Sequence, residues 1–150
     1  MKNDLFNSTY EMELRIAALL CEGKESSFSV ERILAIDFMV CYAKDFHFSD
    51  SNLHCDNSFM YSELSSRRAL IQEAIKPLVY RGVIEAKIEN GYSYKITENG
   101  IQYAQSFESE YARAYRSIAK ELIVELGDFT DERLISLLHR KASEIGEGAN

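Results

Sequence analysis

Apolar and polar residues alternate in two neighbouring stretches near the middle of the chain. Residues 83–88 and 92–96 each follow the two-residue period of a β-strand. Asn90 and Gly91 stand between them, and this pair favours a type I′ turn because both central residues of that turn need a positive φ. The pattern therefore predicts a β-hairpin.

Helical spacing of apolar residues surrounds this hairpin. Residues 63–81 place their apolar side chains on one helical face, and residues 97–107 predict a short helix after the hairpin. Pro77 lies inside the first of these helices, where proline removes a backbone hydrogen bond. We therefore expect either a kink near residues 73–76 or a separate last turn that begins at Leu78.

Two more helices are predicted towards the amino terminus. Residues 9–22 follow Ser8, which has capping-box spacing with Glu11. A helix that begins after Ser29 is apolar around much of its circumference, which is typical of a central core helix. Asp37 interrupts this helix, and we favour a place on its thin exposed stripe over a role as a functional carboxylate.

The order helix, hairpin, helix predicts a mainly α fold with a small β-hairpin wing, a winged helix-turn-helix with additional C-terminal helices. We expect a winged-helix domain over residues 1–108, with a long loop at 45–62 and the wing at 83–97. A helical extension should follow over 109–144, with a helix at 109–126 and another capped by Thr130. Residues 145–150 are expected to form a frayed tail.

Charge separates the central segment from its flanks. The 150-residue chain has a net charge of −7. Residues 61–103 contain six basic and five acidic residues, a net charge of +1, which leaves −8 for the rest. An autonomous DNA-binding domain usually has a basic excess, because neutralisation of phosphates dominates its affinity. The distribution therefore favours a protein partner with basic surfaces, and the acidic terminal helices are candidate docking faces for it.

The cysteines and the apolar segments indicate a cytoplasmic protein. Cys21, Cys41 and Cys55 are odd in number and form no C-x-x-C pair. The first ten residues are polar, and the longest apolar run is much shorter than a membrane span. We therefore expect reduced thiols and no contact with a membrane.

Motifs that carry catalysis or hold cofactors are missing from the sequence. There is no Walker A motif, no G-x-G-x-x-G, no H-E-x-x-H and no G-x-S-x-G. The best metal candidate is the loop group of His47, His54, Cys55 and Asp56, but its spacing does not match that of a structural zinc site. We expect no enzymatic activity, no metal and no cofactor.

The helix before the wing and the wing itself supply the candidate binding residues. Arginines at this place can contact DNA phosphates or carboxylates of a protein partner, and the alternative is an ordinary solvated surface. The candidates for contact with a partner or with a DNA backbone are Arg67, Arg68, Tyr80, Arg81, Lys87, Tyr92, Tyr94 and Lys95.

An ordered series of short motifs covers nearly the whole chain. It comprises LFNSTYEMELRI at 5–16, DF at 37–38, LH at 53–54, SEL at 62–64, RRALI at 67–71, RGVIE at 81–85, Tyr94, TE at 97–98, ESEYARA at 108–114, GD at 127–128 and DE at 131–132. This series resembles the middle components of bacterial ABC three-component systems, the group that includes Lamassu-type antiphage defence. The chain departs from that pattern at Cys55, where proline is usual, and at Pro77.

The resemblance implies an accessory subunit without an active site of its own. Such a subunit would link an SMC- or Rad50-like ABC ATPase to an effector, often a nuclease, and DNA contact would occur only within the complex. The alternative is a stand-alone winged-helix transcription regulator that dimerises through the helix at 109–126.

Overall fold

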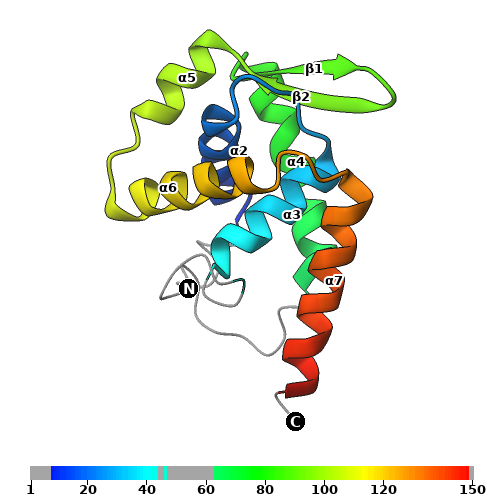
Figure 1. The fold of residues 1–150 in the computed structure, drawn as a ribbon. Helices are drawn as coiled ribbons and strands as arrows, with labels where there is room; N and C mark the ends of the chain where they lie inside the picture. Colours follow the sequence, from blue (N-terminus) through cyan, green and yellow to red (C-terminus); the bar gives the residue numbers. More distant parts are fainter. Residues whose placement is uncertain (1–7, 44–45, 47–62, 149–150) are drawn as a thin grey trace.

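The computed structural model describes residues 8–43, 46 and 63–148. These residues form a mostly helical protein with one small antiparallel sheet (Figure 1), as the sequence pattern predicts. In chain order the elements are α2 (Thr9–Glu22), α3 (Val30–Cys41), α4 (Glu63–Tyr80), β1 (Ile84–Ile88), β2 (Tyr92–Ile96), α5 (Glu98–Gln105), α6 (Glu110–Glu125) and α7 (Asp131–Gly148).

Hydroxyl side chains fix where several of the helices begin. Ser8 accepts a hydrogen bond from the Glu11 amide at 3.1 Å, which confirms the predicted cap of α2. Equivalent bonds at 3.0–3.1 Å start three further helices, with Ser29 capping α3, Thr97 capping α5 and Ser109 capping α6. Each cap satisfies an amide that has no partner inside the helix, so short sequence signals set these boundaries.

The hairpin has the predicted position. Ile84 faces Ile96 at its base and Ile88 faces Tyr92 at its tip. Asn90 and Gly91 have the predicted positive φ, 54° and 102°, and lie in the loop of residues 89–91 that joins Ile88 to Tyr92. The sequence did not reveal a third segment, in which Phe28 exchanges two 2.8 Å backbone hydrogen bonds with Tyr94 on the outer edge of β2. The link between α2 and α3 thereby holds the hairpin against the body.

Helix α4 continues through Pro77. The predicted separate last turn beginning at Leu78 is therefore wrong. Packing explains the continuity, because Leu78 is fully buried and Ile75 nearly so. Tertiary burial of one helical face outweighs the local cost of a single interior proline.

Helices α6 and α7 pack on the body of the molecule. Helix α6 crosses α2 and α3, and α7 runs beside α3 (Figure 1). Helix α7 extends to Gly148, and the predicted fraying of residues 145–150 stays a prediction. A single glycine at position 146 costs the helix only about 1 kcal/mol, which does not end it. The division at residue 108 into two domains stays a prediction.

Arg32 fastens the turn between α6 and α7 to the start of α3. Its guanidinium donates to the carbonyl oxygens of Leu126 at 3.0 Å and Phe129 at 2.8 Å, and it forms an ion pair with Asp131 at 3.1 Å. The hydroxyl of Ser29 donates to the same carboxylate at 2.6 Å. The arginine thus bonds the carbonyl oxygen of Leu126, the C-cap of α6, and that of Phe129 in the turn that follows.

Gly100 allows α5 to lie close to the base of the hairpin, where Val83 precedes β1 and Ile96 ends β2. A Cβ atom at this position would lie 2.0 Å from the carbonyl oxygen of Val83 and 2.7 Å from Cδ1 of Ile96. We expect Gly100→Ala to lower the free energy of unfolding by about 1–3 kcal/mol, because one of these backbones must shift. Thermal denaturation measures this loss. The exposed neighbour Asn99, changed to alanine, is the control and should stay within about 0.5 kcal/mol of wild type.

Candidate partner-binding surface

A buried charge cluster joins four helices of the body, α2, α3, α4 and α6. Asp37 of α3 is only 1% exposed, so the predicted place on an exposed stripe is wrong. Arg15 Nε of α2 donates to its carboxylate at 3.0 Å, and Arg67 Nη1 of α4 donates at 2.7 Å. The hydroxyl of Tyr115 on α6 donates at 2.7 Å. Partners from three distant segments compensate the carboxylate, which explains why an aspartate occupies the core helix.

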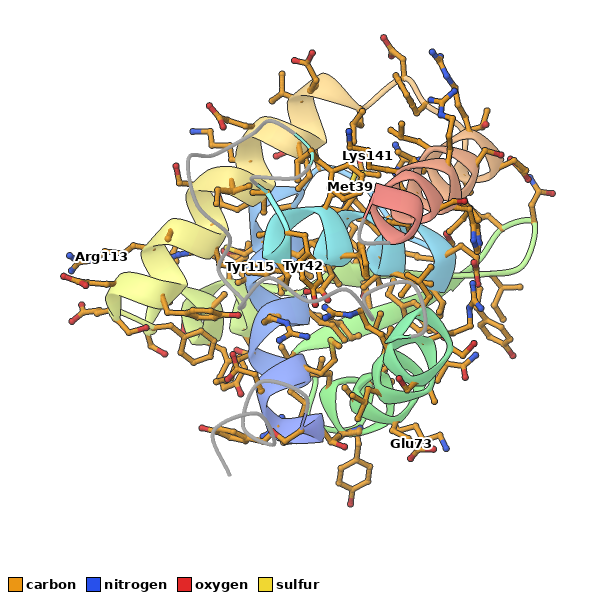
Figure 2. The ribbon with its side chains drawn as sticks, turned by 90° about the horizontal axis from the view of Figure 1, so that it is seen from below. Met39, Tyr42, Glu73, Arg113, Tyr115 and Lys141 are labelled. Carbon is orange, nitrogen blue, oxygen red and sulfur yellow. The ribbon has the colours of Figure 1, made fainter. Side chains whose placement is uncertain are left out.

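Figure 2, seen from below the view of Figure 1, labels Tyr115 of this cluster and several residues around it. Tyr115 and Tyr42 point to the centre of the molecule, between the helices. Arg113, on the same helix as Tyr115, points outward, as does Glu73 of α4. Helix α6 therefore presents one face to the cluster and the opposite face to solvent.

The cluster holds its charges in fixed states. Burial tends to raise the pKa of Asp37, but Arg15, Arg67 and the hydroxyl of Tyr115 outweigh it and lower the pKa to about 2. Burial, together with the nearby Asp37 charge, raises the pKa of the Tyr115 phenol and of the Cys41 thiol. Near neutral pH the carboxylate is ionised while the phenol and thiol are neutral. Because none of these groups changes its protonation state near neutral pH, the cluster is suited to holding the four helices together and poorly suited to transferring a proton.

Arg67 does not belong to the surface that the sequence assigned to it. Its side chain is 2% exposed, lies on Asp37, and places its guanidinium 5.3 Å from the ring centroid of Phe38. The prediction of a partner contact by Arg67 is therefore wrong for this structure. The reason is helical geometry, because consecutive residues point about 100° apart and only one of the two arginines can face outward.

Arg68 points outward and forms a forked ion pair. Its Nε and Nη2 atoms lie 2.8 Å and 2.6 Å from the two carboxylate oxygens of Glu31 on α3. Both side chains are about one third exposed or more, so this pair contributes little to stability. It does, however, neutralise the positive charge that a phosphate group would need.

Charge reversal should separate the roles of these two arginines. Arg67→Glu would place a second carboxylate against Asp37 in the core, and we expect a loss of at least about 3 kcal/mol. Arg68→Glu would repel Glu31 at the surface, with an expected cost of about 1 kcal/mol or less after screening by solvent. Urea titrations followed by circular dichroism measure both. Equal losses would contradict the placement of Arg67 in the core.

The hairpin tip and the end of α4 form the exposed part of the candidate surface. Tyr80 is 91% exposed and Tyr92 is 64% exposed, whereas Tyr94 is partly covered by its bridge to Phe28. Ile88, which the sequence analysis missed, faces Tyr92 across the strands and is 76% exposed. We call the pair Ile88 and Tyr92 the hairpin tip. Its signal in the sequence was the alternating pattern, which places both residues on one face next to the turn.

The remaining basic candidates lie beside carboxylates. Lys87 Nζ is 3.3 Å from Glu85 Oε1, and Lys95 lies directly across the hairpin from Glu85. Arg81 forms an ion pair with Glu13 of α2 and lies 5.7 Å from the ring centroid of Tyr103. Two of these three basic side chains, Arg81 and Lys87, therefore already have a carboxylate partner.

The described residues show no group of three or more His, Cys, Asp and Glu residues that could hold a metal ion. The loop group of His47, His54, Cys55 and Asp56 lies outside the part of the chain that the structure describes. Cys21 and Cys41 are buried free thiols. No helix within the described ranges is long and apolar enough to cross a membrane.

Comparisons with known proteins identify a family for the chain. Neither the curated proteins nor the solved structures gave a match. A family described as ABC-three component (ABC-3C) system Middle Component 2 matches residues 5–148. This range includes every element of the fold, from the capped start of α2 to the end of α7. The chain therefore belongs to the Middle Component 2 family of ABC three-component systems.

Proposed function

We propose that this chain is a non-catalytic accessory subunit that physically links two other components of a bacterial antiphage defence complex of the Lamassu type. One component would be an SMC- or Rad50-like ABC ATPase and the other an effector, which we expect to be a nuclease. The complex would act in the cytoplasm. Family membership supports the existence of partner components, and the exposed hairpin tip supports binding to a protein.

The hairpin tip is the single observation that carries this proposal. Ile88 and Tyr92 expose two large apolar side chains next to each other, where a lone soluble domain gains nothing from them. Aromatic side chains are enriched in protein interfaces and at their energetic centres. An apolar pocket on a partner would remove both side chains from water.

The fold can be read as a winged helix, with α3 and α4 as its two central helices and the hairpin as the wing. The short Phe28 segment then takes the place of the strand that pairs with the wing. In a DNA-binding protein of this kind, α4 would carry unpaired cations on its exposed face. Here Lys76 lies 3.3 Å from Glu73, and Arg68 is paired with Glu31. These pairs favour a protein partner over DNA.

A DNA-binding assay separates this proposal from a stand-alone transcription regulator. We expect the purified chain to bind DNA from upstream of its own gene no more tightly than a scrambled DNA of equal length, at roughly physiological salt. A mobility-shift titration with both DNAs measures the ratio. A preference of about a thousandfold for the upstream DNA would favour the regulator instead.

A further inference from the structure

A hollow of about 280 Å³ opens between α2 and the turn that joins α5 to α6. Its accessible wall is mostly apolar, formed by Leu14, Ala18, Phe107 and Ala112. We call it the α2–α6 pocket. The turn beside it lies at the opposite edge of the molecule from the hairpin (Figure 1), so the pocket and the hairpin tip are separate surfaces.

Two members of the buried charge cluster form the floor of the pocket. Arg15 and Tyr115 line it, and both also donate hydrogen bonds to Asp37. These bonds hold the two side chains in place from below. A side chain that enters the pocket therefore meets a floor that is already ordered. Arg15 and Tyr115 themselves lose little conformational entropy when it binds.

The volume suits one long side chain better than a cofactor. An engineered cavity of about 150 Å³ is large enough to hold benzene. Sites that enclose drug-sized molecules usually occupy about 300–1,000 Å³. At about 280 Å³ the pocket lies between these cases. It can therefore take the full length of a single large or extended side chain from a partner.

Carboxylates set the charge that this side chain should carry. Glu11 and Glu108 line the pocket, and the one basic residue beside them, Arg15, already lies on Asp37. Glu11 is partly buried, and this burial raises its pKa, with Arg15 opposing the effect. A carboxylate that has lost part of its hydration gains more from a cation brought to it than a fully solvated one does.

We propose that the α2–α6 pocket receives a lysine or arginine side chain of a partner component, with the aliphatic stem against the apolar wall and the cationic head at Glu11 and Glu108. Long basic side chains bury their methylene groups while the charge stays at a polar rim. This inference rests on the proposed function. It adds a second docking face, so that the hairpin tip binds one component and the pocket binds the other.

Two variants test the pocket, each with a matched control on α6. Ala112→Phe fills the hollow, and Ser117→Phe adds the same ring to an exposed position on that helix that does not line it. Glu108→Lys reverses the charge at the rim, and Glu121→Lys reverses an exposed charge away from it. Circular dichroism melts check that all four variants fold.

The binding of each variant to the purified ATPase and effector components encoded beside its gene is measured by biolayer interferometry. We expect Ala112→Phe and Glu108→Lys each to weaken the binding of one component by at least tenfold and to leave the other unchanged. The controls should bind like wild type. The component that binds the pocket should dissociate more readily as the salt concentration rises. In the Glu108→Gln variant, the dissociation of this component should depend less on salt.

Three results would overturn the pocket. The first is that both pocket variants bind both components with wild-type affinity. The second is that the Ser117→Phe control loses as much affinity as Ala112→Phe does. The third is that Ala112→Phe changes the oligomeric state of the chain itself, which would make a second copy of the chain the occupant of the pocket. Failure of the proposed function looks different, because wild type itself would then bind neither component.

Discussion

Replacing Asp37 by asparagine is expected to lower the free energy of unfolding by about 3–5 kcal/mol. The asparagine keeps the shape of the side chain but leaves the guanidinium groups of Arg15 and Arg67 in the core without the carboxylate that both contact. Folded domains are stable by only about 5–15 kcal/mol, so this single change removes a large part of the total.

Urea titration of the Asp37→Asn variant measures this loss, with the exposed Asp128→Asn as its control. A loss below about 1 kcal/mol would contradict the role given to the cluster. Tyr115→Phe should fall between the two, because it removes one hydrogen bond to a charged group and leaves both ion pairs intact.

The same carboxylate predicts how stability depends on pH. The pKa of Asp37 is about 2 in the folded chain and about 3.9 in an unfolded one. Because the folded pKa is the lower one, its contribution is fully present above about pH 4 and is lost as the pH falls towards 2. The contribution is on the order of 2 kcal/mol, and the slope below pH 4 should be shallower in Asp37→Asn.

The second large effect is expected at the hairpin tip, on binding and not on stability. The double variant Ile88→Glu/Tyr92→Glu should weaken the binding of one partner component by at least a hundredfold, since central interface side chains contribute about 2 kcal/mol or more each. Both side chains are largely exposed in the chain alone, so its free energy of unfolding should change by about 0.5 kcal/mol or less.

Val124→Glu is the matched control for the hairpin tip. Val124 is an apolar residue of α6 that is 77% exposed, so its replacement removes a similar exposed surface at another place. Isothermal titration calorimetry against each component compares the variants. Wild-type binding by the double variant would remove the hairpin from the interface, and an equal loss with Val124→Glu would show that the effect is not specific.

Local signals made the elements of this fold predictable. Ser8, Ser29 and Ser109 mark helix starts by a hydrogen bond to an amide three residues later, and Asn90 with Gly91 marks the turn by backbone conformation. Each signal acts within a few residues. The sequence pattern therefore placed α2, α3, α6 and the hairpin close to their observed bounds.

The long-range arrangement was not predictable in the same way. Asp37 looked like a surface residue because its partners Arg15, Arg67 and Tyr115 come from three other helices. The bridge from Phe28 to Tyr94 likewise joins residues far apart in the chain. Periodicity describes one helix or strand at a time and does not indicate which distant side chain compensates a buried charge.

The candidate surface was predicted in part. Tyr80 and Tyr92 are exposed as expected, but Arg67 faces the core and Ile88 takes a place that only the hairpin register reveals. The α2–α6 pocket had no signal in the sequence. It arises where α2 meets the turn before α6, and that packing depends on the tertiary structure.

The linking role is tested most directly by asking whether the ATPase and effector components associate only through this chain. The two components encoded beside its gene are co-expressed with it and without it, and each mixture is analysed by size-exclusion chromatography with mass detection. We expect one complex of all three proteins when the chain is present, and separate ATPase and effector peaks when it is omitted. An ATPase–effector complex that forms without the chain, or a chain that elutes apart from both, would contradict the linking role.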